Sequence, residues 1–111
     1  MMYLVKGEFV EENIAGKPQE EALSWIEKVV HPSLEALEKA TQEKKITGGT
    51  IAGERVGVMI LEAPSNEEVG MFLRSLPFWG ALRWTIVPLQ SFKSALEQDK
   101  TAFRQARAMA K

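Results

Sequence analysis

The chain has no cysteine and only one histidine among its 111 residues. Without cysteine there is no disulfide, no thiolate nucleophile and no thiolate-bound metal, and a single histidine makes a zinc site improbable. The sequence therefore predicts a protein that works without metal or cofactor. A formal net charge of −1 also gives no field that would attract nucleic acid or an acidic membrane surface.

Long apolar runs and nucleotide-binding motifs are missing as well. No stretch of 18 apolar residues occurs, so no segment is expected to span a bilayer. The first residues lack the pattern of a signal peptide, and we expect a cytoplasmic protein. No GxGxxG, GxxxxGK or GxSxG motif is present, which removes support for dinucleotide, P-loop nucleotide and serine-hydrolase functions. What remains is one domain, 45% apolar and 26% charged, with enough length for one core.

Hydrophobic periodicity predicts four strands, at residues 2–10, 46–53, 55–62 and 82–89, and helices at 18–43, 65–76 and 91–111. Residues 11–17 are expected to form a loop. Ser65 followed by Glu68 has the spacing of a capping box at a helix start. Pro32 is expected to kink or divide the first helix and to move His31 out of α-helical geometry.

The order of elements predicts an α+β, ferredoxin-like βαββαβ antiparallel sheet over residues 2–90, followed by a C-terminal helix over 91–111. Residues 1–111 form a single domain in this interpretation. Three strands carry apolar residues on both faces, although the crossover helices cover only one face. An exposed apolar face of that size favours a partner sheet stacked against it. We therefore expect a homodimer that closes two sheets into an α+β barrel.

Several short motifs resemble the muconolactone delta-isomerase family. They are Leu76-Pro77-Phe78-Trp79, Ile86-Val87-Pro88-Leu89, residues 62–68, Tyr3-Leu4-Val5-Lys6-Gly7-Glu8 and Ile51-Ala52-Gly53. The likeness covers most of residues 2–90 and leaves out the terminal helix. It implies a dimeric α+β barrel, with larger rings built from dimers, and cofactor-free proton transfer on an unsaturated lactone. Residues 28–32 differ from the charged helix segment of that family, so no catalytic residue is carried over from there.

This resemblance leads to a small-metabolite protein with a pocket between the sheet and the first helix. If it is catalytic, it would be an isomerase that moves a proton on a lactone or organic acid. Two other functions stay open. One is a non-catalytic ligand-binding or assembly module of the same fold, and the other is a cofactor-free oxygenase. A cavity that contains at least two polar candidates would favour the enzyme.

The candidate catalytic residues are Lys6, Glu8 and His31. Histidine is a common general base in enzymes, so His31 would act as one at the pocket mouth, or simply face solvent. Lys6 and Glu8 share one face of the first strand, where they would anchor and deprotonate an organic acid, or satisfy each other.

The candidate substrate-binding residues are Arg83, Phe78, Trp79 and Trp84. Arg83 would hold a carboxylate through two parallel hydrogen bonds, or pair with Glu62 or Glu8 across strands. The three aromatic residues would line a pocket, or instead fill the core or a dimer contact. The terminal helix carries an apolar stripe that either packs on its own sheet or embraces a partner subunit.

Overall fold

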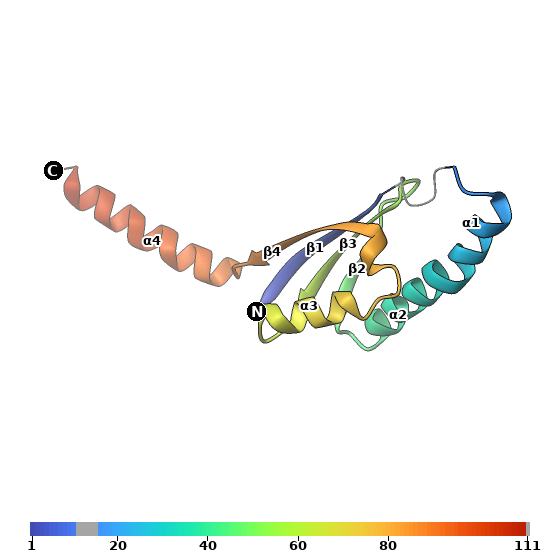
Figure 1. Ribbon diagram of the computed structural model, residues 1–111. Coiled ribbons are helices and arrows are strands. Elements are labelled where there is room, and N and C mark those ends of the chain that lie inside the picture. The colour runs from blue at the N-terminus through green and yellow to red at the C-terminus, as the bar shows by residue number, and fades with distance from the viewer. Residues whose placement is uncertain (11–15, 111) are drawn as a thin grey trace.

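The computed structural model describes residues 1–10 and 16–110, so most of the predicted loop at 11–17 lies outside the described residues. Four strands form one antiparallel sheet in the order β2-β3-β1-β4 (Figure 1). This result confirms the predicted α+β class and is compatible with a ferredoxin-like fold. The strands are β1 (Met2–Phe9), β2 (Ile46–Thr50), β3 (Val56–Glu62) and β4 (Leu82–Leu89), and the helices are α1 (Gln19–Trp25), α2 (His31–Gln42), α3 (Asn66–Arg74) and α4 (Phe92–Met109).

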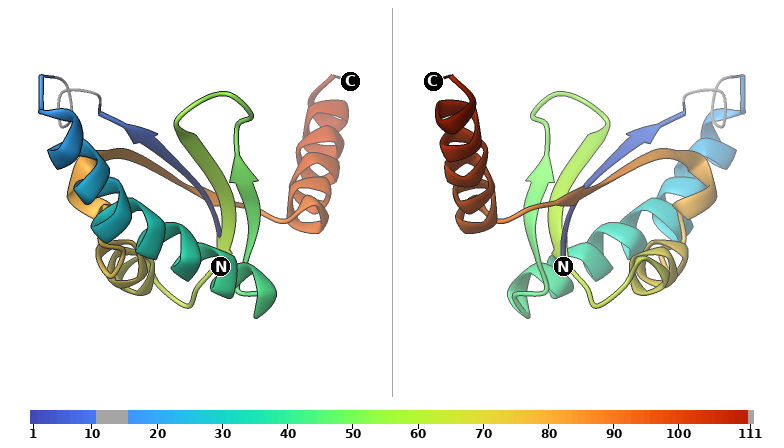
Figure 2. Two further views of the ribbon diagram at one scale, coloured as in Figure 1. Left: turned by 90° about the vertical axis from the view of Figure 1, so that its right-hand side faces the viewer. Right: turned by 90° about the vertical axis from the view of Figure 1, so that its left-hand side faces the viewer.

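The core lies on one face of the sheet, beneath α2 and α3 (Figures 1 and 2). Cross-strand partners share a face in a sheet, and Tyr3 opposite Leu61 and Val5 opposite Met59 point toward the helices. Tyr3 is buried, and its hydroxyl donates to Asn66 Oδ1 at 2.8 Å. The first strand is thereby tied to the start of α3. The other buried apolar residues around it include Ala40, Ile46, Ala63, Val69, Leu73, Leu76 and Phe78.

The helical run before the second strand consists of two α-helices joined by a π-helical turn, which agrees with the expected division near Pro32 but not with the expected geometry of His31. A π-helical turn, Ile26–Val30, joins α1 to α2, and His31 donates its backbone N–H to the carbonyl of Ile26, five residues earlier. His31 has φ −59° and ψ −48° and is therefore α-helical. In an α-helical turn the proline ring would clash with the carbonyl four residues earlier. The wider turn makes room for the ring, so the chain stays helical through Pro32.

Strand β2 lies at the edge of the sheet and packs very closely against β3. Gly48 has φ +154°, and a side chain there would collide with the backbone carbonyl of Val58. Only glycine allows this edge strand to approach its neighbour so closely.

Ahead of β2, Lys45 Nζ lies 3.0 Å from Glu43 Oε2. The hydrogen bond and the positive charge of Lys45 both lower the pKa of Glu43.

The C-terminal helix projects away from the rest of the molecule (Figure 1). None of its residues is buried, and the molecule measures 72 × 30 × 25 Å. Its radius of gyration is 19.3 Å, whereas a compact chain of this length would have about 13 Å. The apolar side chains of α4 therefore do not pack on the sheet of their own chain. Phe92, Phe103 and Met109 are 95%, 60% and 84% exposed.

A membrane-crossing helix is not found among residues 1–10 and 16–110, where every helix is either too short or too polar to span a bilayer.

Candidate functional site

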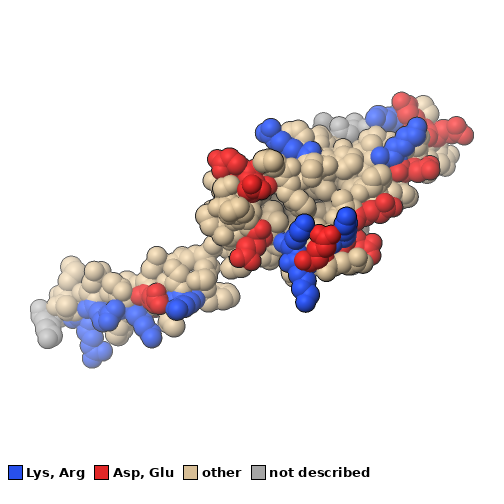
Figure 3. Space-filling view, turned by 90° about the horizontal axis from the view of Figure 1, so that it is seen from below, with Lys and Arg blue, Asp and Glu red and all other residues tan. Residues whose placement is uncertain are grey.

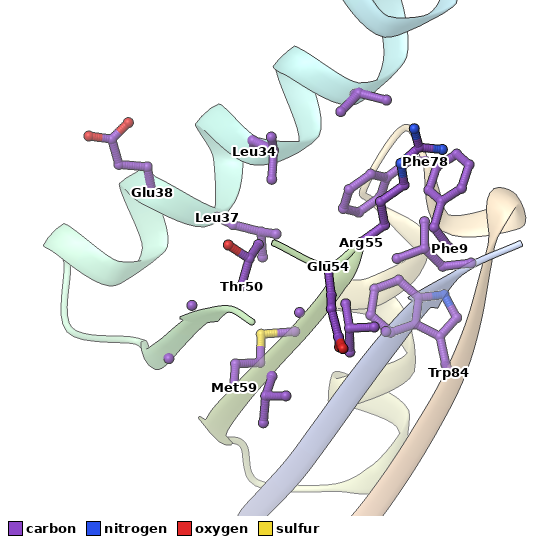
Figure 4. A pocket seen from close by; sticks show the side chains of 18 of the residues that line it. Phe9, Leu34, Leu37, Glu38, Thr50, Glu54, Arg55, Met59, Phe78 and Trp84 are labelled. Carbon is purple, nitrogen blue, oxygen red and sulfur yellow. The ribbon is translucent and has the colours of Figure 1, made fainter. Parts of the chain in front are cut away.

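A pocket of about 540 Å³ lies between the α1–α2 run and the helix-facing side of the sheet (Figure 4). Two glycines, Gly7 and Gly57, face each other across β1 and β3 at its floor. A Cβ atom on Gly7 would lie 2.7 Å from the Trp84 ring, so Gly7 is needed to seat that ring. A Cβ atom on Gly57 would meet nothing within 4 Å. The missing side chain at Gly57 therefore contributes directly to the open volume.

Aromatic rings form one end of this pocket. Phe9 packs edge-on against Trp25, with 5.3 Å between ring centroids, and Phe78 packs edge-on against Trp84 at 6.3 Å. Such edge-to-face pairs are favourable and hold the rings in fixed orientations. The other walls are largely aliphatic, and they include Ile26, Val30, Leu34, Leu37, Ile46 and Met59. The interior therefore suits an apolar or aromatic molecule.

Polar groups lie at only a few places around the pocket. Arg55 is the only cationic residue among the described residues that line it, and Glu38 and Glu54 are the acidic ones. The Arg55 carbonyl accepts the backbone N–H of Phe9 at 3.1 Å, which fixes the start of β3 beside β1. Within the described part of the chain, no carboxylate lies within ion-pair distance of the Arg55 guanidinium. That guanidinium remains available for a ligand anion.

The three predicted aromatic residues separate into two groups. Phe78 and Trp84 line the pocket. Trp79 is not one of its lining residues and is 40% exposed, and the Arg74 guanidinium lies 5.2 Å from the centroid of its ring. The Trp79 carbonyl accepts the indole N–H of Trp84 at 3.0 Å. Trp79 thus orients a pocket residue without lining the pocket.

Lys6, Glu8 and Arg83 lie together on the opposite face of the sheet, away from the pocket. Lys6 Nζ is 3.9 Å from Glu8 Oε1, and Arg83 is the cross-strand partner of Glu8. The side chains of Lys6 and Glu8 are each nearly half exposed. We call these three neighbouring charged residues the ionic cluster, in which only Lys6 and Glu8 are within ion-pair distance. A single copy of the chain leaves them open to water.

His31 is exposed and does not line the pocket. The structure therefore provides a cavity with none of the four polar candidates in its wall. Sequence reasoning missed Trp25, Arg55 and Gly57. Trp25 falls within the helix predicted at residues 18–43, where nothing marks it as a pocket residue, and no local pattern distinguishes the other two.

The sheet face opposite the helices is apolar and half exposed over much of its area. We call it the open sheet face. Its cross-strand partners include Leu4 with Ile60 and with Val87. Val87 is 42% exposed, and none of the helices in the described part of the chain lies over this face (Figure 2). The apolar members of the open sheet face are Met2, Leu4, Val56, Val58, Ile60, Val87 and Leu89, and its polar members include Lys6, Glu8, Arg83 and Thr85.

Within residues 1–10 and 16–110, no three histidine or acidic side chains gather closely enough to hold a metal ion. A comparison with models of protein families gave no match for this chain, and a comparison with curated proteins gave none either.

Proposed function

We propose that this protein binds a small, largely apolar metabolite in the pocket between the sheet and the first helices. The metabolite would carry a carboxylate or lactone oxygen that is held by Arg55. The pocket itself is the observation that supports this function. Its volume of about 540 Å³ falls in the range of small-molecule sites, and its walls are apolar and aromatic with few polar groups.

The Arg55 guanidinium supports the preference for an anionic or carbonyl-bearing ligand. Arginine presents two parallel N–H groups that match a carboxylate. The nearby aromatic rings of Phe9 and Phe78 (Figure 4) would cover a flat unsaturated ligand. Glu38 on α2 and Glu54 ahead of β3 also line the pocket (Figure 4) and would disfavour a ligand with several negative charges.

Binding can be followed by tryptophan fluorescence, because Trp25 and Trp84 line the pocket. We expect 2-naphthoate to quench this fluorescence saturably, both in the natural chain and in a Trp79→Phe variant. In Arg55→Leu, the Kd for 2-naphthoate should rise roughly tenfold or more, since a hydrogen bond to a charged group is worth about 1.5–3 kcal/mol. Native mass spectrometry of the purified protein would reveal a retained metabolite directly.

The neutral analogue 2-naphthalenemethanol provides the control. It should bind the natural chain and Arg55→Leu with similar Kd, because it has no charge for Arg55 to meet. Equal loss of both probes would mean that Arg55 supports the fold and not the ligand. Absence of saturable quenching by either probe, together with no retained metabolite, would contradict a binding pocket.

We also propose that the protein pairs as a homodimer through the open sheet face, as the resemblance to muconolactone delta-isomerases implies. The apolar residues of that face support this proposal, since monomers rarely expose large continuous apolar patches. A second copy stacked there would remove them from water. It would also enclose the cluster of Lys6, Glu8 and Arg83 between two sheets.

That ionic cluster favours a second candidate function, cofactor-free proton transfer on a lactone or organic acid. An enclosed lysine and glutamate 3.9 Å apart would supply a proton donor and acceptor, and Arg83 would hold the substrate oxygen.

The test of this activity is deuterium exchange of α-angelica lactone in D₂O, followed by NMR. Lys6→Met or Glu8→Gln should slow enzyme-dependent exchange by about 10²-fold or more, and Lys39→Met, a change at an exposed helical lysine, should not. If the lactone exchanges deuterium no faster with the natural protein than in buffer alone, this activity is contradicted.

A further inference from the structure

The apolar stripe of α4 has no partner among residues 1–10 and 16–110 of its own chain. We define this stripe as Phe92, Leu96 and Phe103, whose spacing places them on one side of the helix. Their exposed fractions are 95%, 55% and 60%. In proteins most of the stability of a helix comes from packing of its apolar face against other parts of the structure. The stripe therefore needs a surface to cover it.

The position of α4 points to a second copy of this chain as that surface. In both views of Figure 2 the sheet lies between α4 and the α1–α2 run, so α4 leaves on the side of the open sheet face. Strand β4 ends at Leu89, a member of the open sheet face, and α4 starts at Phe92. Two uncovered apolar surfaces thus follow each other directly along the chain. A copy stacked on one of them would lie within reach of the other.

Charge distribution supports the same partner. Residues 92–111 contain five basic and two acidic residues, whereas residues 1–91 contain thirteen acidic and nine basic ones. Figure 3 shows the basic side chains along α4 and most of the acidic ones on the rest of the molecule. The tail of one copy would be attracted to the body of another. Asp99, between Leu96 and Phe103 on the stripe, would meet the basic residues Lys6 and Arg83 of the open sheet face.

We propose that α4 of each copy packs its apolar stripe against the other copy, at the margin of the open sheet face, so that two copies clasp each other reciprocally. This inference rests on the proposed homodimer and names the element that holds it together. A two-fold arrangement makes both contacts identical, so the two tails and the two sheet faces cover one another. The clasp also closes one end of the space that holds the Lys6–Glu8 pair.

The test uses the full chain with arginines placed on α4. Leu96→Arg/Phe103→Arg puts two charges into the stripe, and Thr101→Arg/Gln105→Arg puts the same two charges on the opposite side of the helix. None of these residues is buried, so both variants should keep a folded core. Sedimentation velocity over a micromolar concentration series should show the dimer Kd raised roughly hundredfold or more in the stripe variant. The control variant should match the natural chain.

Hydrogen exchange of the α4 amides separates the clasp from simple stacking of sheets. In the clasp, exchange of α4 slows as protein concentration rises through the dimer Kd. A dimer whose α4 amides exchange rapidly at every concentration would overturn the clasp and leave the sheet dimer standing. Slow exchange of α4 in a monomer would also overturn it, because the helix would then dock on its own chain. A protein that stays monomeric throughout would overturn both the clasp and the homodimer.

Discussion

Replacing Gly57 with phenylalanine is expected to weaken binding of 2-naphthoate by about tenfold or more. A Cβ atom at this position meets nothing within 4 Å, so the new ring would extend into the pocket without displacing the backbone. It would exclude several ligand atoms, each worth roughly 0.3 kcal/mol or more. Phenylalanine also suits a strand better than glycine, so thermal stability should stay the same or increase. Fluorescence titration and thermal unfolding measure the two effects.

Thr47→Val provides the control for this experiment. Thr47 lies on β2 and pairs with Ile60 on the open sheet face, so the substitution changes a strand residue without entering the pocket. It should leave the affinity for 2-naphthoate unchanged. Full binding by a stable Gly57→Phe protein would show that the ligand site lies elsewhere.

Ser33→Ala is expected to lower the free energy of unfolding by about 1–3 kcal/mol. Ser33 is completely buried, its Oγ accepts the backbone N–H of Phe78 at 3.0 Å, and its hydroxyl donates to the Val29 carbonyl at 2.8 Å. Alanine would leave the Phe78 N–H without this acceptor in a dry environment. Because Phe78 lines the pocket, weaker ligand binding should accompany the loss of stability. Urea unfolding measures the free energy.

The matched control is Thr41→Ala on the same helix. Thr41 donates to the Leu37 carbonyl at 2.9 Å, as Ser33 does to Val29, but it is exposed and holds no second group. Its removal should change the free energy of unfolding by less than about 0.5 kcal/mol. Equal effects of the two substitutions would mean that the link between α2 and the Phe78 turn contributes little.

Local patterns were sufficient to predict most of the elements. Ser65 accepts the Glu68 backbone N–H at 3.3 Å, as the capping spacing indicated. Residues 2–10 form the predicted strand, in which Tyr3 and Val5 face the helices and Leu4 and Lys6 face away, because strand side chains alternate between faces. The exception was His31, which keeps α-helical angles although it precedes Pro32. The extended geometry preferred before proline is only a local bias, and here the helix continues through it because the π turn relieves the other clash, between the proline ring and the carbonyl four residues earlier.

The candidate site was harder to predict because it depends on register and on which face the helices cover. Gly7 and Gly57 lie 50 positions apart, and only the pairing of β1 with β3 brings them together at the pocket floor. Lys6 and Glu8 share a face by simple alternation. Nothing local shows that this face is the one that the helices leave uncovered.

The sequence by itself determined the order of strands and helices, the capped start of α3 and the apolar character of both sheet faces, since these follow from the period and chemistry of neighbouring residues. Only the tertiary structure decided that α2 and α3 cover the face of Tyr3 and Val5, that a pocket remains above Gly57 and that α4 turns away from its own sheet. These outcomes depend on packing between segments distant in the chain. Each such contact depends on many weak attractions between atoms of segments that are far apart in the chain. No short stretch of sequence contains both partners.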